Sequence, residues 1–244
     1  MAIISTSAVV LKAYDLRETS KIAVFFTKDH GKVSGVLKGI RSNSRKFGSS
    51  LERFSVNDIV YYQYRNSELH LVSQCDMRSF FYPIRQDLKK SMAAVYALEL
   101  VSLMMPVEMP NPQMYSLMIS FLEDLQDADD IDRLIRFFQI KVLLFSGFRP
   151  HLDVCVHCKK KVVGKAFFSM KEGGLICAGC QRGDRTLHSI SPGTVSTILH
   201  VEKIPWDACR KIRLVQTTRD ELKYILNNFL VFHLGRKVKS AKYM

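Results

Sequence analysis

The sequence predicts an α+β protein with a small N-terminal β-barrel, a C-terminal helical domain, and a zinc ribbon-like module inserted among the helices. Short runs rich in Val, Ile, Tyr and Phe fill the first 80 residues, helical periodicity starts after Pro83, and two Cys-x2-Cys pairs then interrupt the helices. We therefore expect a barrel domain over residues 1–80 and a helical domain over residues 81–244, interrupted by the module at residues 151–187.

Five strands are expected in the N-terminal region, because β-branched and aromatic residues recur there between turn-type segments such as 29–31 and 65–67. Five strands in this length suit a small closed barrel. The five-stranded OB-fold is the common nucleic-acid-binding form, and an SH3-like barrel fits the same pattern. The expected strands are Ala8–Tyr14, Lys21–Thr27, Lys32–Lys38, Val56–Tyr64 and Glu68–Met77.

The remaining chain has the spacing of helices. We expect helices over Ile84–Met105, Pro112–Leu125 and Ile131–Ser146, the last ending at Gly147. Beyond the cysteines, Ser191 and Pro192 form a helix start, with proline at the first helical position. A capping box at 218–221 predicts the start of a final helix that ends at Gly235.

The four cysteines of the inserted module have the spacing of a structural zinc site. Two Cys-x2-Cys pairs are separated by 18 residues, within the range typical of such sites. Each pair can direct two sulfurs at one ion, and four thiolates complete a closed tetrahedron around one structural Zn²⁺. His151 and His157 are bystanders in this interpretation, while Cys75 and Cys209 are core residues. The predicted ligands are Cys155, Cys158, Cys177 and Cys180.

The charge of the chain predicts a polyanionic partner. Thirty-six Lys and Arg against 23 Asp and Glu leave a formal charge of +13, concentrated at both ends and around the cysteines. The N-terminal residues lack a cationic start followed by an apolar run, and no apolar stretch approaches the ~18–20 residues that span a bilayer. We therefore expect a cytoplasmic protein with no membrane partner, whose cysteines stay reduced.

Two basic clusters are candidate nucleic-acid contacts. The segment between the third and fourth strands contains Lys38, Arg41, Arg45 and Lys46 without any acid, and Phe47 follows them. Such a loop can follow a phosphate backbone while an aromatic ring stacks on a base, and we favour this role over a solvated loop with Phe47 inside the barrel. A second cluster follows the last helix and is either a contact or a solvated tail. Its members are Arg236, Lys237 and Lys239.

No catalytic residue is predicted. The sequence lacks a phosphate-binding GxxxxGK[ST] loop, a GxSxG nucleophile elbow and an HExxH metal motif. A four-sulfur zinc site also leaves no coordination position for a substrate. We therefore expect a binding protein and not an enzyme. Two alternatives stay open, a zinc-dependent nucleic-acid-processing enzyme such as a nuclease or deaminase, and a zinc-ribbon scaffold that binds proteins first.

Several segments resemble the bacterial recombination mediator family RecO. The N-terminal run at 11–22 is specific, and similar agreement continues in the same order over nearly the whole chain. The other segments are 26–33, 38–41, 44–48, 147–150 before the cysteines, and 233–235 with Lys239 and Ser240.

The resemblance implies an OB-fold barrel, a helical domain and, as in many family members, an inserted zinc module. Members bind single- and double-stranded DNA, anneal complementary strands, and act with RecR in the RecF pathway. They help load RecA onto DNA coated with single-stranded-DNA-binding protein, whose acidic tail contacts the helical domain. The resemblance also implies DNA repair at the nucleoid, and loop contacts to DNA from Lys38, Arg41, Arg45 and Lys46. Some members lack the cysteines, so zinc is not required by the family function.

Overall fold

The structure is a computed structural model that describes residues 2–41, 47, 51–181, 183 and 186–243. The chain divides into two compact units, residues 1–129 with 239–244, and residues 130–238. The first unit contains the barrel and the second contains the four cysteines. The barrel shares its compact unit with the helices that follow it, while a domain boundary at residue 80 stays a prediction.

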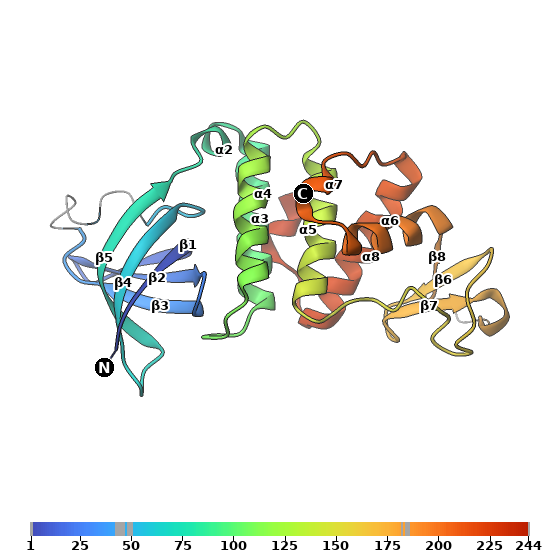
Figure 1. The fold of residues 1–244 in the computed structure, drawn as a ribbon, viewed down its shortest axis with the longest axis horizontal. Helices are drawn as coiled ribbons and strands as arrows, with labels where there is room; N and C mark the ends of the chain where they lie inside the picture. Colours follow the sequence, from blue (N-terminus) through green and yellow to red (C-terminus); the bar gives the residue numbers. More distant parts are fainter. Residues whose placement is uncertain (1, 42–46, 48–50, 182, 184–185, 244) are drawn as a thin grey trace. The chain divides into compact units, whose positions relative to one another are not determined.

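Five strands close into the predicted barrel (Figure 1). Their order around the ring is β1-β2-β3-β5-β4, and β1 completes the ring because it pairs with both β2 and β4. The β3–β5 pair is parallel and the others are antiparallel, which is the arrangement of an OB-fold. The strands are β1 (Ala2–Leu16), β2 (Ser20–Thr27), β3 (Gly31–Leu37), β4 (Val56–Gln63) and β5 (Leu69–Ser79).

Among its described residues, the first unit also contains the helices α2 (Tyr82–Gln86), α3 (Leu88–Met104) and α4 (Pro112–Gln126). The β2–β3 turn touches the α3–α4 connection, where a Cβ on Gly31 would lie 2.2 Å from the Met109 carbonyl oxygen. Lys32 Nζ donates to the carbonyls of Ser102 and Met105 at 2.8 and 2.9 Å, which caps the end of α3. The barrel is thereby fixed to its following helices.

The second unit contains the helices α5 (Ile131–Phe145), α6 (Pro192–Lys203), α7 (Trp206–Cys209) and α8 (Gln216–Leu234). Arg136 of α5 is the largest fully buried side chain among the described residues. Its guanidinium donates to Asp132 at 2.8 Å, to Gln139 at 2.9 Å and to Asn227 of α8 at 3.1 Å. The buried charge is therefore fully hydrogen-bonded and holds α5 against α8.

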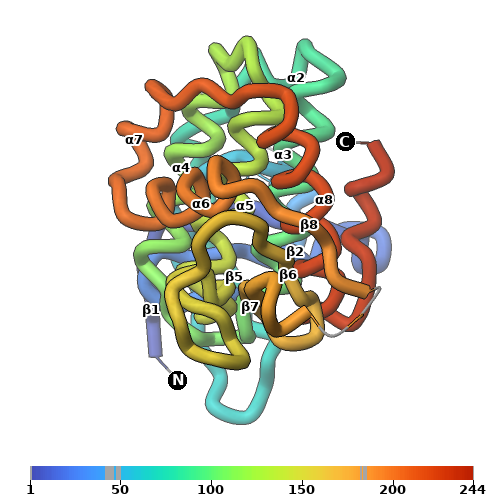
Figure 2. Tube along the Cα trace, turned by 90° about the vertical axis from the view of Figure 1, so that its right-hand side faces the viewer, coloured from blue at the N-terminus to red at the C-terminus, as the bar shows by residue number. Residues whose placement is uncertain are grey.

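The cysteine-bearing segment forms a small three-stranded sheet, which faces the viewer in Figure 2. Strands β6 (Ala166–Ser169) and β7 (Gly174–Cys177) form a hairpin, and β8 (His188–Ile190) pairs with β6. The short η1 (Ala178–Cys180) follows β7. Phe168 packs edge-on against Phe229 of α8 with 5.6 Å between ring centroids, so the sheet is anchored to its own unit's helices.

Two predicted helix starts differ from the structure. The helix expected over Ile84–Met105 is divided, because Asp87 is extended and its side chain accepts from the backbone N–H groups of Lys89 and Lys90. The predicted capping box at 218–221 lies inside α8, which begins at Gln216. Glu221 instead accepts from the backbone N–H and the hydroxyl of Ser191, at 2.9 and 2.8 Å, and so joins α8 to the start of α6.

Among the described helices, none is both long and apolar enough to cross a lipid bilayer.

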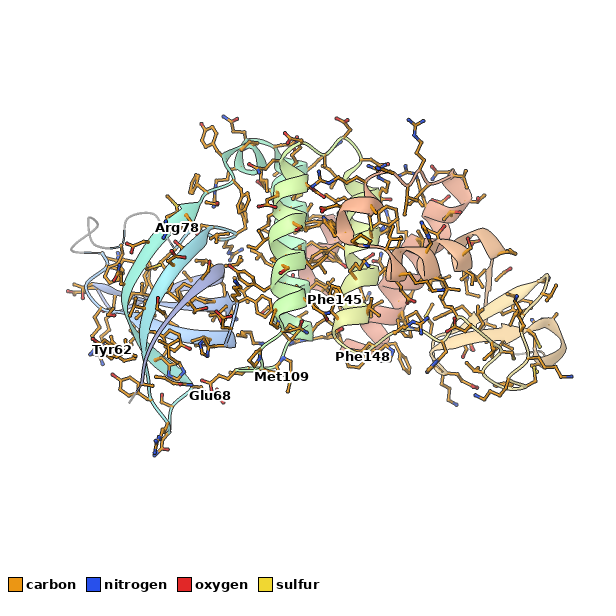
Figure 3. The ribbon with its side chains drawn as sticks, viewed as in Figure 1. Tyr62, Glu68, Arg78, Met109, Phe145 and Phe148 are labelled. Atoms are coloured by element: carbon orange, nitrogen blue, oxygen red, sulfur yellow. The ribbon has the colours of Figure 1, made fainter. Side chains whose placement is uncertain are left out.

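An aromatic cluster surrounds His233 near the end of α8. The ring centroids of Phe148, Phe229 and Phe232 lie 4.9, 4.3 and 5.5 Å from that of the imidazole, and Phe148 is labelled in Figure 3. The Nε2 atom of His233 is buried and has no hydrogen-bond partner among the described residues. Burial lowers the pKa of His233, so the folded protein favours the neutral ring.

This site predicts a stability loss in mild acid. The unfolded state binds a proton at His233 more readily than the folded state, so the free energy of unfolding falls as pH drops below the ordinary histidine pKa of about 6.5. We expect His233→Phe to reduce this loss. Urea denaturation of both proteins between pH 7.5 and 5 measures it, and identical pH dependence in the two would contradict the expectation.

Candidate metal centre and nucleic-acid interface

The structure brings the four predicted ligands together. The sulfur atoms of Cys155, Cys158, Cys177 and Cys180 all lie within 4.8 Å of one another. Zn–S bonds of about 2.3 Å in a tetrahedron require sulfur atoms about 3.8 Å apart. The Cys158 and Cys177 sulfurs are 3.8 Å apart. The donor set and its spacing therefore fit one tetrahedral metal ion with sulfur ligands.

Local backbone hydrogen bonds set the direction of the cysteines. The Cys155 N–H donates to the Lys160 carbonyl and the Lys159 N–H donates to the Cys155 carbonyl, both at 2.9 Å, which folds the first pair into a tight turn. The Cys177 N–H donates to the Cys155 sulfur at 3.4 Å and links the two pairs. Backbone donors of this kind stabilise thiolate sulfur.

Two cysteines of the cluster have shifted pKa values. Burial raises the pKa of Cys155, but the backbone N–H groups of Cys158, Cys177 and His157 outweigh it and lower the pKa to about 6. The pKa of Cys180 rises to about 12, because its thiol hydrogen-bonds to the neighbouring sulfurs of Cys177 and Cys158. Thiolate is the metal-binding form of cysteine, so binding of a divalent cation would release the thiol protons that remain.

Neither nearby histidine belongs to the cluster of possible ligands, as predicted for bystanders. The His157 Nε2 lies 2.8 Å from Glu172 Oε1. The backbone of His151 runs beside β7, donating to Gly173 at 2.8 Å and accepting from Leu175 at 2.9 Å. Among the described residues, the only cluster with metal-ligand geometry consists of the four cysteines.

The first two of the predicted loop cations lie at one end of the barrel. Lys38 and Arg41 are exposed. The Arg41 N–H donates to the Thr19 carbonyl at 3.0 Å and its guanidinium donates to the Arg17 carbonyl at 3.3 Å. This joins the β1–β2 turn to the β3–β4 connection and adds the exposed cation Arg17, which sequence reasoning missed. Arg45 and Lys46 lie outside the described residues.

The outer surface of β1, β2 and β3 continues from these cations. Tyr14 is 50% exposed and pairs with Ile22, which pairs in turn with Val36, so the three form one row across the strands. Lys12 Nζ lies 5.3 Å from the centroid of the Tyr14 ring. Side-chain alternation places Lys38, two residues beyond Val36, on the same side. We call this surface, with Arg17 and Arg41 at its end, the barrel face.

Arg78 of β5 and Arg85 of α2 are already engaged by other side chains. Arg78, labelled on β5 in Figure 3, forms a salt bridge with Asp58 of β4 at 2.5 Å. Arg85 lies over the rings of Phe54 and Phe80, 4.2 and 3.9 Å from their centroids. In contrast, Lys12, Arg17, Lys38 and Arg41 form no ion pair with an acid among the described residues. The barrel face thus carries exposed positive charge that is available to a ligand.

The prediction that Phe47 offers a stacking platform is wrong. Its side chain is 3% exposed and belongs to the barrel core, together with Ile40 and Leu51 from the same connection and with Phe25 and Ile59 from the strands. The β3–β4 connection closes the barrel interior with these apolar side chains. An exposed ring for stacking is present instead at Tyr14.

The C-terminal cluster is only partly a free tail. Arg236 and Lys237 are exposed after Gly235, which ends α8 in the left-handed conformation as predicted. Lys239 begins η2 (Lys239–Tyr243), and its backbone N–H donates to Glu99 Oε1 at 2.8 Å. The N–H and hydroxyl of Ser240 donate to the other oxygen of Glu99, at 2.9 and 2.6 Å.

The whole chain matches one protein family. Residues 1–81 match the family model described as "Recombination protein O N terminal", and residues 85–242 match "Recombination protein O C terminal". "DNA repair protein RecO" of Syntrophus aciditrophicus is 29% identical over 241 residues, which cover 97% of this chain and 93% of the relative. The protein of the same name from Alkaliphilus metalliredigens is 29% identical over 235 residues, with 96% and 95% covered. The chain therefore belongs to the RecO family.

Proposed function

We propose that this protein is a non-enzymatic DNA repair and recombination mediator that binds single- and double-stranded DNA and anneals complementary strands. The barrel face carries the proposal, because it combines an exposed aromatic ring with cations that form no ion pair with any acid that the structure describes. On OB-folds the surface of strands 2 and 3 and the loop between strands 1 and 2 are the usual oligonucleotide site. Backbone neutralisation together with ring stacking binds single strands with little sequence preference.

Annealing follows from charge neutralisation. Two single strands repel each other through their phosphates, and a protein that neutralises both backbones lowers this repulsion while the base edges stay free to pair. The step forms only hydrogen bonds and base stacks, so it consumes no nucleotide. This agrees with a sequence that has no phosphate-binding loop.

Family membership supplies the proposed partners. The protein acts with RecR in the RecF pathway to help load RecA onto single-stranded DNA coated with single-stranded-DNA-binding protein, whose C-terminal tail it contacts. It works in the cytoplasm at the nucleoid. One structural Zn²⁺, held by the four cysteines, completes the folded module, and its closed sulfur ligation leaves no position for a reacting group.

The loop cations give the proposal its test. Replacing Lys38, Arg41, Arg45 and Lys46 by alanine removes four predicted phosphate contacts. At a slope of about −0.7 per contact, the dependence of log K on log salt for single-stranded DNA should flatten by ~3. Fluorescence anisotropy titrations at salt concentrations between about 50 and 300 mM measure this slope.

The control removes four exposed lysines elsewhere, namely Lys28, Lys89, Lys203 and Lys211. It changes net charge equally and should leave the slope nearly unchanged. Equal slopes for both variants and the parent protein would remove the barrel loop from the DNA site. Retained annealing in that case would favour the protein-binding scaffold. Cleaved or deaminated DNA after incubation with divalent ions would instead favour the enzyme.

A further inference from the structure

A group of lysines extends from the first cysteine pair. Lys159, Lys160, Lys161 and Lys165 are all exposed, and we call residues 159–165 the lysine turn. The hydrogen bonds that direct Cys155 toward the other sulfurs also fix the turn, because they use the N–H of Lys159 and the carbonyl of Lys160. Metal binding and the placement of these cations are thus one local structure.

The backbone at Lys159 is unusual for a lysine. Its φ angle is +60°, in the left-handed region that favours glycine. A side chain held in this conformation is strained, and such residues gather at sites of function. In this chain a lysine occupies a position where glycine would relieve the strain.

The acids of the described module do not neutralise the lysine turn. Asp153 pairs with Arg149 at 3.2 Å and Glu172 pairs with His157 at 2.8 Å. None of the four lysines forms an ion pair with an acid in the part of the chain that the structure describes. Four thiolates around Zn²⁺ leave two negative charges, so the four lysines exceed the charge of the metal site itself.

The lysine turn offers charge without a stacking surface. Phe167 is 6% exposed, and Lys165 Nζ covers its ring at 5.4 Å from the centroid. The groove beside the turn is lined mainly by aliphatic side chains, including Val162, Val163 and Leu199. A strand bound here would be held by its phosphates alone, and its bases would stay free.

We propose that the lysine turn is a second binding site for a single DNA strand, which it presents for pairing with the strand held at the barrel face. This rests on the proposed annealing function and adds where the second strand binds. The two sites differ in chemistry, because the barrel face combines cations with Tyr14 whereas the lysine turn contacts phosphates only. Binding at the turn should therefore be independent of sequence.

The test uses the full-length zinc-loaded protein and two short, non-complementary oligonucleotides that carry donor and acceptor dyes. Energy transfer reports both strands on the protein, and anisotropy with one labelled strand reports binding of the first strand. The variant combines Lys159→Gly, which suits the left-handed backbone, with Lys160→Gln and Lys161→Gln. The control combines Lys203→Gln, Lys211→Gln and Lys223→Gln, which are exposed lysines on α6, after α7 and on α8.

We expect the turn variant to keep one zinc per chain and to bind the first strand like the control. Its second-strand affinity should fall on the order of fifty-fold at 0.15 M salt, and the salt slope of that step should flatten by about 2, from three contacts at about −0.7 each.

Energy transfer and annealing equal to the control would overturn the proposal. If the turn variant loses zinc, the single change Lys161→Glu serves as the test, because it leaves the hydrogen-bonded turn intact. This variant should reduce second-strand binding, and unchanged binding would overturn the proposal. A parent protein that binds both strands and does not anneal them would contradict the annealing function and leave this site standing.

Discussion

Cys177→Ser is expected to release one Zn²⁺ per chain and to unfold residues 151–187, while the barrel stays folded. Structural zinc sites contribute on the order of 10 kcal/mol in zinc-finger peptides, more than a three-stranded sheet of this size can supply from its own packing. Cys177 ends β7, and its sulfur lies 3.8 Å from that of Cys158, so the substitution affects both cysteine pairs. The barrel belongs to the other compact unit and has its own apolar core.

Metal content per chain, limited proteolysis and thermal unfolding measure these three outcomes. Cys209→Ala is the matched control, because Cys209 is a buried cysteine of the same unit that lies outside the cluster. It should retain the metal and the protease resistance of the module. A Cys177→Ser protein that still holds one zinc per chain, or a metal-free parent protein whose module resists protease, would contradict the site.

The cysteine site could be predicted in full because its determinants are local. Each Cys-x2-Cys pair encodes a single turn, and the 18 intervening residues suffice for the hairpin that brings the pairs together. The strands could be predicted approximately for the same reason. The start of β1 at Ala2 was missed, because residues 2–7 alternate polar and apolar side chains weakly and are ordered by pairing with β4.

The barrel face could not be predicted, since it depends on how the ring closes. Nothing in the run around Tyr14 distinguishes an inward side chain from an outward one until the pairing of β1 with β2 is known. Arg17 joins the loop cations only because Arg41 reaches back to the β1–β2 turn. The sequence pattern left both roles open for Phe47, and the need to fill the barrel interior decides between them.

Phe47→Ala and Tyr14→Ala should therefore have opposite consequences. Removing the buried ring of Phe47 leaves a cavity in the barrel core and should lower the free energy of unfolding by ~3–5 kcal/mol. Removing the exposed ring of Tyr14 should cost at most ~1 kcal/mol of stability, the usual value of a cross-strand pair.

Tyr14→Ala should instead weaken single-stranded DNA binding by ~1–3 kcal/mol, since base stacking on an aromatic ring contributes about that much per base. This corresponds to a loss of about 5- to 150-fold in affinity. Urea denaturation and anisotropy titrations on the same preparations separate the two effects, and Phe47→Leu controls for the size of the cavity. A destabilised Tyr14→Ala protein with normal DNA affinity would show that the Tyr14 ring has a structural role only. A stable Phe47→Ala protein with impaired DNA binding would show that Phe47 is the stacking residue. Because one barrel carries both rings, the pair of variants shows directly whether DNA binds on its outer surface or depends only on its folded core.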